Sequence, residues 1–239
     1  MAVYLIIFSS SQMEKSFGVI CEGPSDYRII KRILELFFKG EEIFITCIQP
    51  KPLPSGKSDF GGWPKVLESC GNDTLKEIFE FNSYAIIQID TDCSQDKPFN
   101  VPHVDGNGKV KSNKQLCENV IIRLENLITQ PEIQDKKQRI LVAICIHSIE
   151  CWLLPILYSD HNNSKINNCI HELNRGIQRK YKKMVILNDK NKNEPNGIKV
   201  FDRVISEWRR KTDVIVAARN NAGFQKFIDS LIELQADET

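Results

Sequence analysis

The chain has 239 residues, 41% of them hydrophobic, which is enough for the core of one large domain or of one domain with an appendage. Its 32 basic and 31 acidic residues exclude a protein that binds nucleic acid through bulk positive charge, or an acidic chaperone. Any basic surface must therefore come from local segregation of charge.

The predicted elements alternate between strands and helices. In chain order they are a strand (16–21), a helix (25–38), a strand (42–48), a helix (64–81), a strand (84–89), a helix (113–129), a strand (139–146) and a short helix or turn (149–158). Ser25 is the expected N-cap of the first helix. The polar stretch after Asp90 is long for a loop, so we expect it to be functional or partly disordered. The alternation predicts an α/β fold with a mostly parallel sheet flanked by helices.

Beyond about residue 160 the sequence becomes helix-rich and basic. Helices are predicted at 164–182, 198–211 and 222–235. The segment from Lys165 to Asp213 holds 13 Lys or Arg and 6 Asp or Glu, a local excess of seven positive charges. We therefore expect three parts: an N-terminal extension (1–15), an α/β core (16–160) and a helical C-terminal part (161–239) packed on or beside the core.

The N-terminus begins with MAVYLIIFSSSQ, a short apolar run with no basic segment before it. The run is too short to span a bilayer and makes a poor signal peptide, so we expect no membrane partner. Met13 is a second plausible start. Our hypothesis is that residues 1–12 form an extension, or an extra edge strand, outside the essential fold.

Eight cysteines are spread along the chain, and none forms a CxxC pair. Most of them lie in apolar runs, where a free cysteine behaves as a small core residue. The pattern argues against a zinc site or a disulfide framework and favours a reducing cytoplasm.

Carboxylates follow two of the predicted strands. Glu22 ends the first strand, and Asp90 and Asp92 end the strand YAIIQI. The carboxyl ends of parallel strands share one edge of a sheet, which is where open α/β folds place ligands. Carboxylates that converge there repel one another, and a hard divalent cation such as Mg²⁺ keeps them ionised. Asp26, one helical turn after Glu22, either joins this site or complements the helix dipole.

This arrangement resembles the TOPRIM domain, in which one strand ends in a glutamate in an EGxxD or EGxxE context and a later strand ends in DxD. The matching residues are Glu22-Gly23-Pro24-Ser25-Asp26 and Asp90-Thr91-Asp92, with one further strand and helix between them. The likeness is greatest to the TOPRIM nucleases of the OLD-like and RloB-like type, which belong to bacterial anti-phage and abortive-infection systems.

Three further stretches fit that resemblance, which covers roughly residues 16–235. FGGWPKVL (60–67) opens a helix before the DxD strand, and NNAGFQKFIDSL (220–231) is similar to a helix near the end of the family's chains. In HSIECWLL (147–154), Glu150 matches a family acid.

The resemblance implies a metal-dependent nuclease. Glu22, Asp90 and Asp92 would be the catalytic residues and would hold Mg²⁺ or Mn²⁺, with Asp26 or Glu150 contributing to a second metal. The expected activity is endonucleolytic cleavage of DNA or RNA, with tRNA among the candidates, by a toxic effector of anti-phage defence. A partner protein, such as an ATPase sensor from the same operon, would restrain or trigger it, and the protein is a candidate homo-oligomer. SGKS (55–58) is not a P-loop, because the required first glycine would fall at Lys51.

Candidate nucleic-acid contacts are basic. The stretch RGIQRKYKKM (175–184) places cations around Tyr181, a pattern that suits binding of a phosphate backbone. Such a stretch is also often a solvated helix face. The candidates are Arg28, Lys57, Arg179, Lys180, Lys182 and Lys183.

Other interpretations of these residues stay open. Strand-end acids also cap helices and turns, Glu150 is equally a helix-start acid, and His147 fits a buried or supporting histidine better than a general base. The whole chain could instead be a non-catalytic module that keeps the TOPRIM fold to bind a partner, or a phosphotransferase or phosphatase on a small substrate. A deep closed pocket would favour the small substrate, and a wide basic cleft would favour nucleic acid.

Overall fold

A four-stranded parallel sheet forms the centre of the molecule. The computed structural model describes residues 15–53, 59, 61–182 and 184–236. The strands are β1 (Lys15–Ile20), β2 (Ile43–Gln49), β3 (Tyr84–Asp90) and β4 (Ile140–Cys145). Their order in the sheet is β2-β1-β3-β4, and every pairing is parallel. The predicted α/β class with a mostly parallel sheet is therefore confirmed.

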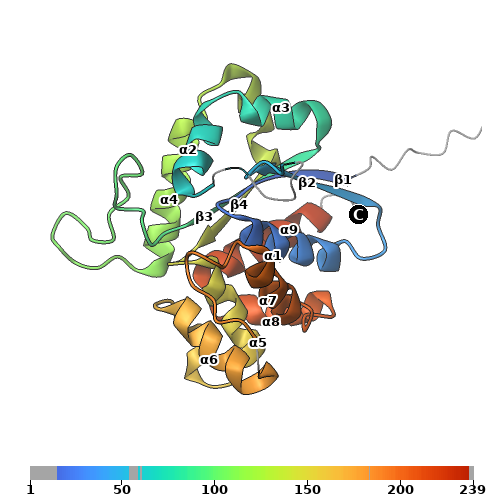
Figure 1. The fold of residues 1–239 in the computed structure, drawn as a ribbon. Coiled ribbons are helices and arrows are strands. Elements are labelled where there is room, and N and C mark those ends of the chain that lie inside the picture. The colour runs from blue at the N-terminus through green and yellow to red at the C-terminus, as the bar shows by residue number, and fades with distance from the viewer. Residues whose placement is uncertain (1–14, 54–58, 60, 183, 237–239) are drawn as a thin grey trace, which may run out of the picture.

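Helices cover both faces of this sheet (Figure 1). They are α1 (Pro24–Phe37), α2 (Trp63–Gly71), α3 (Thr74–Phe81), α4 (Asn113–Leu127), α5 (Leu154–Leu157), α6 (Cys169–Tyr181), α7 (Pro195–Ile205), α8 (Lys211–Ala218) and α9 (Ala222–Ala236). Short 3-10 segments are η1 (Pro131–Arg139), η2 (Ile149–Leu153) and η3 (His161–Ser164). Figure 1 shows α2, α3 and α4 on one side of the sheet, with α1 and the C-terminal helices on the other.

Side chains alternate along the strands and so build two cores. Phe17 and Val19 of β1 are buried with α1 and the C-terminal helices, whereas Ile20 is buried with α2, α3 and α4. The rings of Trp152 in η2 and Phe224 in α9 stack with centroids 4.2 Å apart. Burying each large apolar side chain contributes roughly 1.5–3 kcal/mol. Phe224 of α9 is buried in the same cluster as Phe17 and Val19 of β1, so the helices after residue 160 share a core with the sheet.

Two predicted helices are wrong in their extent. The helix predicted at 64–81 is interrupted at Asn72, whose side-chain oxygen accepts a hydrogen bond from the Thr74 amide and so begins α3. The helix predicted at 198–211 ends at Ile205, and α8 begins at Lys211. There the Asp213 carboxylate accepts hydrogen bonds from the backbone amides of Arg209 and Arg210, at 2.9 and 3.0 Å. These bonds favour the start of a new helix.

Smaller corrections concern the ends of elements. Ser25 is not the N-cap of α1, because the helix begins at Pro24 and Gly23 takes the cap position. The helix predicted to begin at 164 begins at Cys169, after the separate turn η3. Lys15, expected in the N-terminal extension, is the first residue of β1. The rest of that extension lies outside the described residues.

The long polar segment after β3 is ordered by its own contacts. The Ser94 hydroxyl donates to the Val101 carbonyl at 2.9 Å, and the His103 ring bonds the Thr91 carbonyl at 2.8 Å. Arg123 of α4 donates to the carbonyls of Pro98 and Phe99. These bonds hold the segment against α4 and the end of β3.

One disulfide departs from the cysteine prediction. Cys151 of η2 and Cys169 of α6 are joined, although the cysteine pattern argued for reduced thiols. Folding brings them together because η2 packs on the start of α6, a contact between segments 18 residues apart. The other six cysteines are free. Within the described ranges, no helix combines the length and apolarity needed to cross a membrane.

Gly223 allows α9 to approach β4 closely. A Cβ at this position would lie 1.9 Å from the Ile144 carbonyl oxygen. Gly223→Ala is therefore expected to lower the free energy of unfolding by about 2 kcal/mol through overpacking, measured by urea denaturation. Gly71→Ala is the matched control, since nothing lies within 4 Å of a Cβ there. Equal stability of the two variants would contradict this close packing.

Candidate functional site

The acidic residues predicted from strand ends meet at the carboxyl edge of β1 and β3. A carboxylate oxygen of Glu22, which follows β1, accepts the backbone amide of Asp90 at 2.7 Å. Gln88 lies between them: its oxygen accepts the Glu22 amide at 3.1 Å and its NH₂ group donates to the Asp90 carboxylate at 2.8 Å. Gln88 is fully buried, so this bridge fixes the spacing of Glu22 and Asp90.

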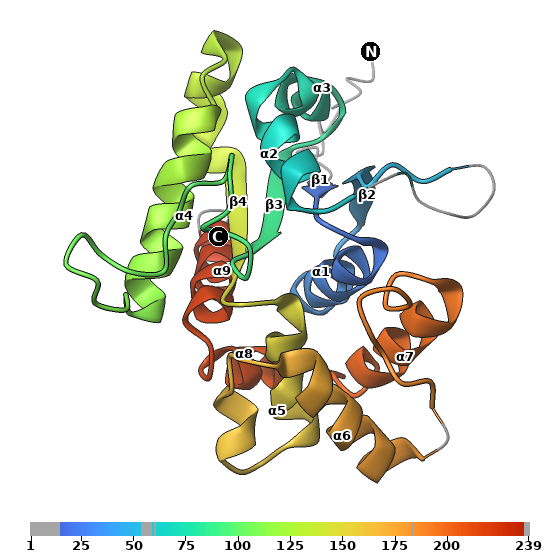
Figure 2. The same ribbon diagram turned by 60° about the vertical axis from the view of Figure 1, so that its left-hand side comes forward.

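The turn between β1 and α1 is held by a loop from the C-terminal part. Asn193, which precedes α7, accepts hydrogen bonds from the Ser25 amide at 3.2 Å and the Ser25 hydroxyl at 2.8 Å. A Cβ on Gly23 would lie 2.6 Å from the same Asn193 oxygen, so a larger residue there would displace the Asn193 side chain. Figure 2 shows this orange loop beside the blue start of α1. Asp26 is thereby fixed, buried, in the first turn of the helix.

The backbone after β4 positions the turn after β3. The His147 carbonyl accepts the amides of Thr91 and Asp92, at 3.1 and 3.0 Å, and the His147 amide donates to the Thr91 hydroxyl at 2.7 Å. His147 has a left-handed backbone, with φ of 66°. Asp92 itself is exposed. His147 thus supports the site through its backbone, and Asp92 stands at the rim beside the buried Asp90.

A lysine from the loop before α7 lies beside these acidic residues. The ammonium of Lys192 lies 3.0 Å from a carboxylate oxygen of Glu150, which is 1% exposed in η2. Its charge also acts on Glu22, Asp26 and Asp90. We define the acidic cluster as Glu22, Asp26, Asp90 and Glu150. Within the described part of the chain, Lys192 is thus a cation that acts on all four carboxylates.

The charge balance shifts the pKa of every group in the cluster. Burial and neighbouring carboxylates raise the pKa of Glu22 to about 8, that of Asp26 to about 7, and that of Asp90 well above its usual range. Burial also acts on Glu150, but the Lys192 ammonium and a bond from Ser148 hold its pKa below the ordinary value. Burial opposes the charge of Lys192, yet Glu150, Asp26 and Asp90 together raise its pKa.

The donor set suits a hard cation, although the side chains are not gathered around one. Among the residues that the structure describes, no three acidic, histidine or cysteine side chains converge as a ready-made metal site. Glu22 is turned to the Asp90 amide and Glu150 to Lys192. However, all the acids offer carboxylate oxygens, the ligands that Mg²⁺ and Mn²⁺ prefer, and one lysine cannot balance four of them. The donor chemistry therefore suits a divalent cation, which would take the place of the protons that the raised pKa values leave on Glu22, Asp26 and Asp90.

Stability without divalent cations should fall as the pH rises from about 5 to 8. The native protein keeps protons on Glu22 and Asp26, with pKa values of about 8 and 7, after the unfolded chain has lost them near 4.5 and 3.8. The native state then binds more protons than the unfolded state, so the free energy of unfolding decreases with pH. Urea denaturation at pH 5, 6.5 and 8 measures the slope.

Two controls accompany that measurement. Glu22→Gln removes one of the raised groups and should flatten the slope. Added Mg²⁺ should restore stability most at pH 8, where the cluster is ionised. A free energy of unfolding that is constant or rises over this range in wild type would contradict the charge balance.

Three of the six basic residues predicted to bind nucleic acid, Arg28, Arg179 and Lys180, have partners within the protein. Arg28 forms a two-pronged ion pair with Asp202, with both bonds at 2.8 Å. Arg179 donates to the Leu157 carbonyl and lies over the Tyr158 ring, and Lys180 pairs with Glu207. Lys182 is exposed at the end of α6. Lys57 and Lys183 lie outside the described residues. The nucleic-acid role of this set stays a prediction.

Three residues of the site were not predicted from the sequence: Gln88, Lys192 and Asn193. Gln88 had a usable signal, since it is a polar residue inside the otherwise apolar strand YAIIQI. The other two lie in the loop NDKNKNEPNG, which has no periodicity and resembles any solvated connection. Their contacts with Glu150 and Ser25 span 42 and 168 residues, so local pattern could not reveal them.

Comparisons with protein-family models, with curated proteins and with solved structures found no match to this chain. The structure itself shows an α/β protein with a parallel sheet, and its acidic cluster lies largely buried at the carboxyl edge of that sheet.

Proposed function

We propose that the protein is a metal-dependent phosphodiesterase that cuts nucleic acid. The observation that carries this proposal is a set of electrostatically coupled carboxylates, Glu22, Asp26, Asp90 and Glu150, at one sheet edge beside Lys192. Burying so many carboxylates is costly, and a purely structural role would be served as well by neutral side chains. The order of the acidic motifs also fits the TOPRIM resemblance.

Each residue has a role in this proposal. Glu22 and Asp90, with Asp92 at the rim, would hold Mg²⁺ or Mn²⁺, and Asp26 or Glu150 would contribute to a second ion. When bound, such a cation polarises the phosphate and activates water. Gln88 holds Glu22 and Asp90 at a fixed spacing. Lys192 keeps Glu150 ionised and Asn193 fixes the turn that carries Asp26. The substrate would approach past Asp92.

The site suits a large substrate better than a small molecule of the kind that binds in a closed pocket. Asp92 is exposed and Glu22 is half-buried, so one side of the acidic cluster opens to solvent. The segment that delivers Lys192 belongs to the basic stretch from Lys165 to Asp213. The excess positive charge of this stretch would favour a polyanion over a small phosphorylated molecule. The wider role as a defence effector controlled by a partner ATPase rests on the resemblance and belongs to the same proposal.

The test is cleavage by the purified protein. Plasmid DNA, single-stranded DNA, total RNA and tRNA would each be incubated with Mg²⁺, with Mn²⁺ or with EDTA, and the products separated on denaturing gels. We expect cutting that EDTA abolishes, and the preferred substrate identifies the target. A folded protein that cuts none of these, alone or with the product of the neighbouring gene, would contradict the proposal and favour a module that only binds.

A further inference from the structure

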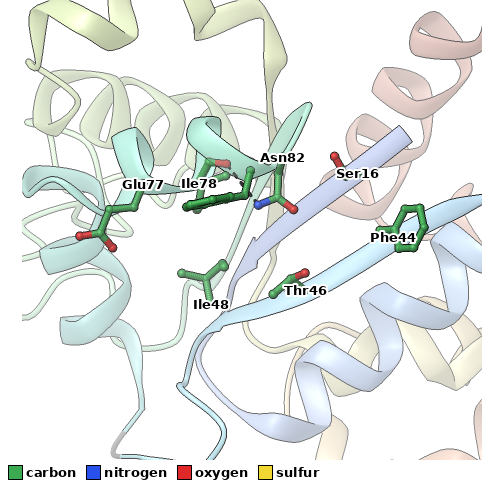
Figure 3. Close-up of a pocket in the computed structure, with 8 residues that line it drawn as sticks. Ser16, Phe44, Thr46, Ile48, Glu77, Ile78 and Asn82 are labelled. Atoms are coloured by element: carbon green, nitrogen blue, oxygen red, sulfur yellow. Dashed lines mark hydrogen bonds between the residues drawn. The ribbon is translucent and has the colours of Figure 1, made fainter. Parts of the chain in front are cut away.

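The edge strand β2 leaves one face of the sheet partly uncovered. Its alternate side chains Phe44, Thr46 and Ile48 point towards the side of the sheet that carries α3 (Figure 3). Phe44 is 47% exposed. On the opposite side of the same strand, Ile43 and Ile45 pack with the core beneath α1. One face of β2 is thus buried and the other forms the floor of a groove.

Helix α3 forms the wall of this groove without covering it. The helix lies directly over β1. A Cβ added to Gly18 of β1 would come within 2.7 Å of the Ile78 side chain of α3. At the end of the same helix, Phe81 is 81% exposed. The groove between α3 and β2 encloses about 610 Å³. Two exposed aromatic side chains, Phe44 and Phe81, therefore line one groove, and exposed apolar groups gathered in this way mark a docking site.

The chain itself supplies an occupant at the end of this groove. Ser16, the second residue of β1, lines the groove and pairs in register with Phe44. Residues 1–14 lead directly into that point and lie outside the described residues. They include six consecutive apolar residues, VYLIIF at 3–8, followed by the polar link SSSQME at 9–14. A six-residue link reaches about 20 Å, more than enough to return past the start of β2.

We propose that residues 3–8 dock in the groove between α3 and β2. The chain enters at Ser16, so the segment runs antiparallel to β2, with Phe8 towards Phe44 and Val3 towards Ile48. In an extended segment, alternate side chains point to one side, so every second residue of VYLIIF would face the groove. A segment of six residues is about 20 Å long, which matches the length of a seven-residue strand such as β2. The apolar run is thereby buried in its own chain, and this inference is independent of the proposed nuclease activity.

The first test is a site-specific cross-link. Phe44 is replaced by p-benzoylphenylalanine, which keeps an aromatic ring in the groove, and the full chain is irradiated and analysed by peptide mass spectrometry. We expect a cross-link within one chain to residues 3–8. The same replacement at Ile122, which is 54% exposed on α4, is the control and should not reach them. A cross-link of doubled mass would show a second copy in the groove, and a link to other residues or none would likewise overturn the proposal.

The second test compares amide hydrogen exchange in the full chain and in a chain that begins at Met13. Amides in β2 are expected to exchange at least tenfold faster in the shorter chain, whereas those in α4 should not change. Ile6→Asp in the full chain should have the same effect, which guards against misfolding of the shorter chain. Exchange in β2 that is unchanged by both alterations would overturn the proposal.

Discussion

Replacement of Glu22 by glutamine is expected to reduce metal-dependent cleavage at least a hundredfold without destabilising the fold. The amide oxygen of glutamine can still accept the Asp90 amide, so the hydrogen bond of 2.7 Å is kept and only the charge is lost. Loss of a metal-binding carboxylate should raise the barrier by about 3 kcal/mol, which corresponds to that factor in rate. Because the pKa of Glu22 is raised to about 8, its charge opposes folding, and the variant should unfold at an equal or higher urea concentration.

The two readouts separate catalysis from stability. Glu118→Gln on α4 is a matched control, since this exposed glutamate lies on a helix away from the strand ends, and it should leave both readouts unchanged. Asp90→Asn should behave as Glu22→Gln does. Cleavage by Glu22→Gln within threefold of wild type would exclude Glu22 from the reaction, even if the protein is otherwise a nuclease.

Replacement of Lys192 by methionine is expected to lower the free energy of unfolding by about 3 kcal/mol at pH 8. The variant keeps an apolar stem of similar length but leaves Glu150, which is 1% exposed, without its ion pair. The loss should shrink at pH 5, because Glu150 and its neighbours then take up protons. Urea denaturation at both pH values measures the difference.

A double variant and a variant of an exposed ion pair test whether the unpaired charge of Glu150 causes this loss of stability. Lys192→Met combined with Glu150→Gln removes both charges and should recover most of the lost stability, since no unpaired charge is then buried. Lys180→Met breaks the exposed pair with Glu207 and should cost less than about 1 kcal/mol. If Lys192→Met lowers the free energy of unfolding by no more than Lys180→Met does, then Lys192 does not stabilise the buried charge of Glu150.

The strands and their acidic ends could be predicted from the sequence because the signals are local. Apolar runs such as YAIIQI have few alternatives to a buried strand, and parallel alternation then places Glu22 and Asp90 at one edge. Asp26 was singled out by its position one helical turn after Glu22, and Glu150 by the TOPRIM resemblance. Helix ends were less certain because they depend on single side chains. Asn72 and Asp213 begin new helices at points where the helical periodicity alone continues.

The cation of the site could not be predicted, because a charged loop residue carries no local sign of its partner. Lys192 is one of 13 basic residues between Lys165 and Asp213 and differs from the others only in where the fold takes it. The disulfide between Cys151 and Cys169 was missed for a similar reason, since neither the spacing nor the apolar context of the cysteines distinguishes a pair.

The contact between Asn193 and Ser25 spans 168 residues and sets the order in which the site forms during synthesis. A ribosome adds roughly 5–20 residues per second, so β1 and its glutamate emerge on the order of ten seconds before the loop that carries Lys192. Over that interval the strands can pair while their acidic edge has neither its lysine nor its clamp. Long-range contacts of this kind form slowly and late. A chain interrupted before residue 192 would therefore lack the completed site, and it would also lack α7, α8 and α9, which share a core with the sheet. Any activity of the site thus belongs to the nearly finished chain.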